Sequence, residues 1–330
     1  MADLKFVCLL LAICFNSFCD GARQSTPKIK ARTKKFMTHG SHTDNWAVMV
    51  GMMPYYHEDI NEASLLSIYY MIKKLGIPDS HIILMLANNV ACHRANPLPG
   101  RVLCGIDDVF DVYNDAEVDY RGDEVTVENV LRVLTDRHPP GTLRSKRLLS
   151  NHKSNVFIYL TGHGAHVSLM QMRENERFHS KQLGAAINEM RRQNRFNEIL
   201  VMTMTCHAAS MCKYLTGENV LCIGSSRADE ISHSEWIKPN RPNKRAASTY
   251  RFTRAVARVL DKALRETDHI YSMEDVVASC PREVCNSSVT ARRDLYPKKL
   301  ERVPVTDFMG MKRKIRFLPL EEVPYSEFEH

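Results

Sequence analysis

The chain has 330 residues, of which 44% are hydrophobic, 25% are charged and 8% are aromatic. This composition is ordinary for a globular protein and excludes long disorder, and the length suits one large α/β domain with appendages. The net charge is +7. Because the basic residues are spread out, without an aromatic platform or zinc-finger spacing, we expect no nucleic acid as a partner.

Residues 1–19 have the pattern of a secretory signal peptide. Lys5 precedes the apolar run Phe6–Phe15, and small or polar residues follow it up to Cys19. A run of about ten residues is too short to span a bilayer, which takes roughly 20. The alternative is a buried N-terminal helix. No later stretch is long and apolar enough to cross a membrane, so we expect a lumenal chain.

The rest of the chain divides into a flexible polar and basic lead-in at 20–43, a domain at 44–315 and a C-terminal tail at 316–330. Continuous apolar runs predict buried strands, and apolar residues at a spacing of three or four predict helices. The expected strands are 46–50, 82–86, 155–160, 199–202 and 220–224. The expected helices are 65–75, 127–134, 182–195 and 250–264. Residues 87–124 form a long, acid-containing connection, which is often functional in a compact domain.

Alternating strands and helices predict an α/β fold with a mainly parallel central sheet flanked by helices. Ligands of such sheets bind at the carboxyl ends of strands. His163 lies between two glycines just after one predicted strand, and Cys206 follows the next strand, 43 residues on. If these strands are neighbours, the imidazole can activate the thiol as a nucleophile. The N–H groups of Gly164 and Cys206 would then face a developing oxyanion.

Less specific interpretations of these residues remain open. A cysteine after a strand is usually a small buried hydrophobe, and a histidine beside glycine is usually a turn residue. His166 and His207 flank the same two positions, so a zinc site with His163 and Cys206 is a further alternative.

Ten cysteines are present, and removal of the signal peptide would leave seven. An odd number in an oxidising compartment predicts an intermolecular bridge or a free thiol. Cys280 and Cys285 flank Pro281 and could close a small loop, whereas the pairing of Cys104, Cys212 and Cys222 stays open. Asn286 begins an N-glycosylation sequon.

Specific motifs resemble those of the catalytic subunits of GPI-anchor transamidases, a legumain-related, caspase-like family of cysteine peptidases. The resemblance runs from about residue 44 to about 315. It is strongest in Lys74–Ser80 and Glu117–Gly122. The other matching segments are Asp44–Val48, Ile82–Leu86, Tyr159–Gly164, Thr205–Cys206, Val276–Cys285 and Thr306–Phe308.

The resemblance implies roles for individual residues. It makes His163 the catalytic histidine and Cys206 the nucleophile, and it needs no cofactor for the chemistry. It makes Cys92 the cysteine that bridges to a partner subunit, and it pairs Cys280 with Cys285. It also implies a structural calcium site, whose predicted ligands are Asp79, Ile82, Glu117 and Asp119. Carboxylates and a backbone carbonyl are a reasonable set for a hard cation.

Some positions differ from the family pattern. The loop after His163 continues as Ala165–Met172, and Met204 replaces an acid two residues before the nucleophile. Glu58 stands where a substrate-positioning asparagine is expected. Ser232 is the best candidate on the other side of the substrate site, where Ser225 and Ser226 are also retained.

The implied activity has two halves. Cys206 cleaves the C-terminal signal of a proprotein through a thioester, and the ethanolamine amine of a GPI lipid then replaces the thiol. The implied location is the endoplasmic reticulum lumen, at the membrane through partner subunits. Two alternatives remain: a catalytically weak or inactive member of the transamidase complex, and a free lumenal, legumain-like endopeptidase.

Overall fold

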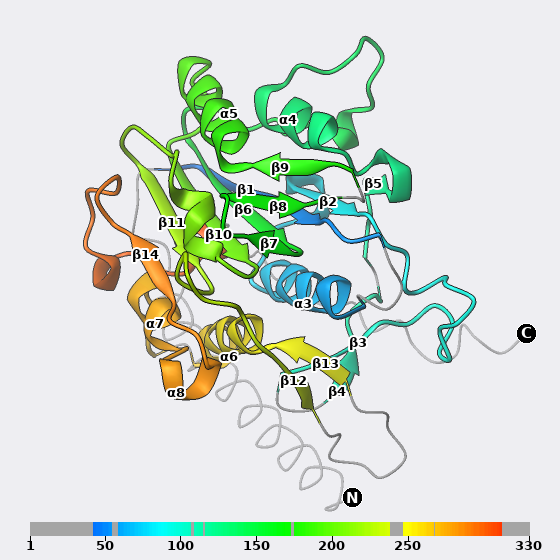
Figure 1. The fold of residues 1–330 in the computed structure, drawn as a ribbon. Helices are drawn as coiled ribbons and strands as arrows, with labels where there is room; N and C mark the ends of the chain where they lie inside the picture. The colour runs from blue at the N-terminus through cyan, green and yellow to red at the C-terminus, as the bar shows by residue number, and fades with distance from the viewer. Residues whose placement is uncertain are drawn as a thin grey trace, which may run out of the picture. The chain divides into compact units, whose positions relative to one another are not determined.

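The computed structural model describes residues 42–54, 59–106, 109–114, 116–172, 175–237, 247–266 and 268–311. A seven-stranded sheet with the order β14-β11-β10-β6-β1-β2-β5 runs through the middle of this part (Figure 1). Its strands are β1 (Asp44–Gly51), β2 (Ile82–Leu86), β5 (Tyr120–Arg121), β6 (Ser154–Thr161), β10 (Glu198–Met204), β11 (Val220–Gly224) and β14 (Thr290–Arg292). Every neighbouring pair is parallel except β11 with β14. The predicted mainly parallel sheet is confirmed.

The central strands are buried on both faces, which explains their continuous apolar sequences. In β6, Val156, Ile158 and Leu160 pack on one face of the sheet, and Phe157 and Tyr159 pack on the other. The same alternation of neighbouring side chains holds in β1 and β10. The sheet therefore separates two hydrophobic clusters, and each cluster needs a layer of helices to cover it.

Helices cover both faces of the sheet, as predicted (Figure 1). The cluster that contains Phe157 is covered by α3 (Asp59–Lys74), α6 (Arg251–Arg265) and α7 (Met273–Ala278). The cluster that contains Ile158 is covered by α4 (Val127–Thr135) and α5 (Ser180–Arg192). Helix α5 ends three residues before its predicted end, because Asn194 adopts a left-handed conformation with φ of 54°.

Short elements occupy the connections. They are β3 (Leu103–Gly105), β4 (Val109–Asp111), β7 (Gly164–Ala165), β8 (Leu169–Gln171), β9 (Arg177–His179), β12 (Ser234–Ile237), β13 (Ala247–Tyr250), α8 (Arg282–Cys285) and α9 (Thr306–Met309). Single 3-10 turns are η2 (Asp79–His81), η3 (Gly122–Glu124), η4 (Arg144–Lys146), η5 (Ala208–Cys212) and η6 (Leu300–Arg302). The long connection at 87–124 thus contains β3, β4 and β5, which the apolar pattern did not indicate.

Several predictions fall on residues that the structure does not describe. The signal peptide at 1–19, most of the lead-in at 20–43 and the tail at 316–330 lie outside the described residues, as does Glu58. Within the described ranges, no helix combines the length and hydropathy that a membrane span requires.

Candidate active site

The segments that carry His163 and Cys206 leave the sheet side by side. Strands β6 and β10 are parallel neighbours, and their last paired residues are Thr161 and Met204. Each candidate residue comes two positions after that pair, and the Gly162 amide donates to the Met204 carbonyl oxygen across 3.4 Å. The carboxyl ends of the two strands therefore bring both segments to one edge, as the sequence predicted.

Gly164 touches the backbone of the nucleophile's segment. A Cβ atom at this position would overlap the Cys206 carbonyl oxygen and Oγ1 of Thr205. Only a residue without a side chain allows so close an approach. Its N–H is the group that we expect to face the oxyanion, and this role remains a prediction.

Three serine hydroxyls converge on the carbonyl oxygen of Thr205, the residue before the nucleophile. Ser225, Ser226 and Ser232 lie 3.1, 3.2 and 2.8 Å from it. The Ser225 hydroxyl also accepts from the Thr205 amide at 3.2 Å and lies 2.7 Å from the Ser232 hydroxyl. The predicted substrate-binding residue Ser232 thus lies next to the nucleophile's segment.

His207 follows the nucleophile in a left-handed conformation, with φ of 58°. Its amide donates to the Glu230 carbonyl oxygen at 2.7 Å, and its Nδ1 lies 3.0 Å from the Ala228 carbonyl oxygen. Its ring contacts that of His166 in a tilted arrangement, with centroids 3.6 Å apart and an interplanar angle of 38°. Among the described residues, no group of three or more His, Cys, Asp or Glu side chains is arranged to hold a metal ion. The structure thus gives the zinc alternative no support and places His166 and His207 in ring contact.

Met204 is fully buried in the cluster that contains Phe157. The end of β10 is therefore held by apolar packing at this position, where the family pattern has an acid. Strand β10 also extends two residues beyond its predicted end at 202. Cys206 is half-buried and forms no disulfide, while His163 is exposed.

Two of the predicted calcium ligands, Asp79 and Glu117, contact the hydroxyl of Tyr69. The Tyr69 hydroxyl donates to Asp79 and accepts from the Glu117 amide at 3.0 Å. The other oxygen of Asp79 pairs with the Lys73 ammonium at 2.6 Å. Burial raises the pKa of Asp119 to about 6, and the negative charges of Glu117 and Asp79 add to this effect. The positive charge of Lys146 lowers the pKa of Asp119 and partly offsets this effect. The absence of a metal-holding group among the described residues covers these three carboxylates as well.

The other two predicted ligands, Ile82 and Asp119, each form a hydrogen bond that involves a backbone amide. The Ile82 amide donates to the Asp79 carbonyl, which ties the start of β2 to η2. An Asp119 carboxylate oxygen accepts from the Leu84 amide at 2.9 Å. Binding of calcium stays a prediction.

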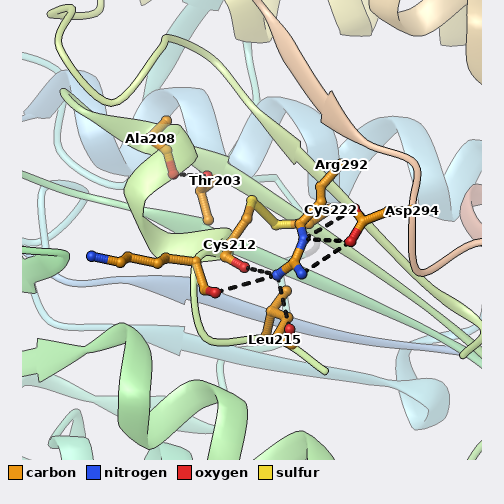
Figure 2. Close-up of a disulfide and its surroundings, with 8 residues drawn as sticks. Thr203, Ala208, Cys212, Leu215, Cys222, Arg292 and Asp294 are labelled. Atoms are coloured by element: carbon orange, nitrogen blue, oxygen red, sulfur yellow. Dashed lines mark hydrogen bonds and ion pairs between the residues drawn. A yellow bond between two sulfur atoms is a disulfide. The ribbon is translucent and has the colours of Figure 1, made fainter. Parts of the chain in front are cut away.

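Among the cysteines that the structure describes, four form two disulfides. Cys280 pairs with Cys285, as the resemblance implied. Cys212 pairs with Cys222, a bond that the sequence left open, and it joins η5 to β11 (Figure 2). Cys92 is exposed and forms no disulfide within the described chain, which fits the predicted intermolecular bridge.

The structure also shows the surroundings of Cys104 and of the sequon residue Asn286. Cys104 is buried and unpaired, and burial raises the pKa of its thiol. Asn286 is exposed just after α8, so its side chain is accessible for the predicted glycosylation.

Comparisons with known proteins identify the family of this chain. Residues 45–296 match the model of the peptidase C13 family. The chain is 41% identical over 290 residues to a putative GPI-anchor transamidase of Caenorhabditis elegans, covering 87% of this chain and 89% of the relative. It is 39% identical to the GPI-anchor transamidase of Homo sapiens and 37% identical to that of Saccharomyces cerevisiae. Those matches cover 87% of this chain and 71% and 68% of the relatives. The chain therefore belongs to the peptidase C13 family of cysteine peptidases.

Proposed function

We propose that this protein is the catalytic subunit of a GPI-anchor transamidase, with Cys206 as the nucleophile and His163 as the general acid and base. The observation that carries the proposal is the register of β6 and β10. It brings the two residues to one sheet edge, with Gly164 against the Cys206 backbone. The names of the relatives supply the substrate class.

In the first half of the reaction, His163 takes the thiol proton and the Cys206 sulfur attacks the carbonyl carbon at the cleavage site. The N–H groups of Gly164 and Cys206 stabilise the resulting oxyanion. The C–N bond then breaks, and the departing amine takes the proton from His163. The products are a thioester on Cys206 and the released C-terminal peptide.

In the second half, the amine of the lipid's ethanolamine phosphate attacks the thioester carbon. His163 accepts the amine proton, the C–S bond breaks, and the Cys206 sulfur leaves as thiolate and is reprotonated. The products are an amide between protein and lipid and the regenerated enzyme. Ser232, and Glu58 by the family pattern, are the proposed substrate-positioning residues.

The proposed setting is the endoplasmic reticulum lumen, with other transamidase subunits holding the chain at the membrane. Cys92 is the proposed covalent link to one of them, since it is exposed and unpaired in the described chain. A Cys92→Ser chain should lose a disulfide-linked partner on non-reducing gels. Cys104→Ser is the matched control, because Cys104 also forms no disulfide but is buried. Equal partner recovery by wild type and Cys92→Ser would contradict the link.

The test of function is rescue of cells that lack their own transamidase catalytic subunit. Wild type should restore GPI-anchored protein at the surface, whereas Cys206→Ala and His163→Ala should not, at equal expression. A well-expressed chain that restores nothing but retains its partners would be an inactive complex member. A purified chain that hydrolyses small peptides without partners would be a free endopeptidase.

A further inference from the structure

The short helix η5, which follows the nucleophile, is held in position by groups outside the helix. This 3-10 helix has five residues, and such helices have strained hydrogen bonds. At its start, Thr203 Oγ1 donates to the Ala208 carbonyl at 3.3 Å, and the Ala208 amide donates to the Ser226 hydroxyl at 3.1 Å. These bonds fix the end of η5 that adjoins Cys206 and His207, but they leave the far end to other groups.

Two groups from neighbouring strands hold the far end of η5, and both bind Cys212 (Figure 2). Its sulfur is bonded to Cys222 of β11, and its carbonyl oxygen accepts from Nη1 of Arg292 at 2.7 Å. Arg292 belongs to β14 and is the register partner of Cys222 in the antiparallel pair. The covalent bond and the charged hydrogen bond therefore converge from one edge of the sheet.

The Arg292 side chain is itself held in place. Its Nη1 also donates to the Leu215 carbonyl oxygen at 2.8 Å, so it spans the carbonyls exposed after η5. Its Nε and Nη2 donate to Asp294 at 3.1 Å on the opposite side of the guanidinium. This ion pair holds the pKa of Asp294 below its ordinary value. A planar guanidinium with fixed donors suits this bridging geometry, and an ammonium does not.

We propose that the Cys212–Cys222 disulfide and Arg292 form a positioning clamp that sets the reactivity of the nucleophile. The clamp fixes the far end of η5, whose near end, Ala208, lies two residues after Cys206, so the sulfur stays within reach of the His163 imidazole. Loss of either part lets the turn move, and the Cys206 sulfur is aligned with the His163 imidazole in a smaller fraction of molecules. The clamp rests on the proposed role of Cys206 but not on the identity of the substrate.

A purely stabilising role is the competing explanation, because a disulfide also stabilises a fold by restricting the unfolded chain. A stabilising bond changes the melting temperature without changing the chemistry of the folded enzyme. A positioning clamp lowers kcat and the reactivity of Cys206 while the chain stays folded and KM holds. The two explanations thus differ in quantities that can be measured below the melting temperature.

The test uses the full chain with Cys212→Ala and Cys222→Ala together, and separately Arg292→Met and Arg292→Lys. The first readout is the rate at which iodoacetamide alkylates Cys206, followed by mass spectrometry of its peptide. The second is the kcat of transamidation in the assembled complex. We expect both to fall about tenfold in the disulfide and Arg292→Met variants, with KM changed less than about twofold, since small misplacements are costly to catalysis. Arg292→Lys should fall between these variants and wild type.

The matched control is Arg147→Lys. Arg147 also pairs with an aspartate through Nε and Nη2, which donate to Asp136 at 3.2 and 3.0 Å, outside the nucleophile's turn. We expect it to leave both readouts unchanged. Wild-type alkylation and kcat in a folded Arg292→Met or disulfide variant would overturn the clamp. If wild type alkylates normally but transfers no lipid, the proposed function fails, while the alkylation comparison still decides the clamp.

Discussion

The turn after β10 and the acidic cluster at the start of β2 are stabilised by opposite means. Around Thr205, neutral hydroxyls from Ser225, Ser226 and Ser232 surround one carbonyl. In the acidic cluster of Asp79, Glu117 and Asp119, the negative charges of Asp79 and Glu117 act on Asp119, Lys73 pairs with Asp79, and Lys146 partly offsets the charge at Asp119. The first region is held by hydrogen bonds between neutral groups, whereas the second is held by interactions between charged groups.

Because of this difference, the two regions should respond to different changes: one to backbone shifts, the other to cations and protons. A site built from neutral donors and acceptors is preorganised by the chain alone and loses function when backbone positions shift. A site with excess negative charge gains stability from an added cation or proton. Substitutions at the first should therefore act on catalysis, while calcium and pH should act on stability through the second.

The largest expected effect is that of Gly164→Ala. The added methyl would collide with the Cys206 carbonyl oxygen and with Thr205, so the loop of His163 must move away from the nucleophile. We expect kcat to fall at least about a hundredfold, since misplacement on the ångström scale can cost that much. The measurement is transamidase turnover together with alkylation of Cys206.

Gly51→Ala is the matched control, because a Cβ there would meet Leu86 and Leu65 at 3.5 and 3.6 Å, ordinary contact distances. It should keep activity within a few-fold of wild type. Normal turnover by a folded Gly164→Ala protein would show that the close approach does not matter to catalysis.

The position of the active site at the ends of strands could be predicted from sequence, because apolar runs indicate which segments are buried strands. His163 and Cys206 each come shortly after one of those runs, and this position alone assigns both residues to strand ends. Strand ends involve residues close together in the chain, so a short sequence pattern can predict them. The sequence predicted only that the Gly164 N–H would face an oxyanion; the close approach of Gly164 to the Cys206 backbone is seen in the structure.

The groups that hold the nucleophile's turn could not be predicted in the same way. Arg292 and Cys212 are 80 residues apart in the chain, and only the antiparallel addition of β14 brings them together. No periodic pattern marks a three-residue edge strand such as Thr290–Arg292. The Cys212–Cys222 pair likewise depends on where η5 folds back over β11. The roles proposed for Ser232, Glu58 and the calcium ligands stay predictions.

The effect of calcium on the melting temperature is the next test of the contrast between the two regions. We expect millimolar calcium to raise the melting temperature by a few degrees, since a ligand at 100 times its Kd adds about 2.7 kcal/mol to the free energy of unfolding. Asp119→Asn removes one ligand charge and should abolish most of the shift, whereas Asp136→Asn, outside the acidic cluster, should not. Melting curves that coincide with calcium and with chelator would remove the calcium proposal and leave Lys73 and Lys146 as the cluster's cations.

The smallest expected effect is a pH dependence of stability without calcium. The Asp119 pKa is raised to about 6 in the folded protein, against an ordinary 3.8. Between these values the folded state keeps a proton that the unfolded state has lost, so the free energy of unfolding falls as pH rises from about 4 to about 6. The Asp119→Asn variant can keep the hydrogen bond from the Leu84 amide, but its side chain carries no charge. Because the carboxyl is partly exposed, we expect this variant to be about 1 kcal/mol more stable than wild type above pH 6 and equal to it near pH 4. Denaturant titrations at both pH values measure this difference, and a gap of equal size at both would show that the charge of Asp119 is not its cause.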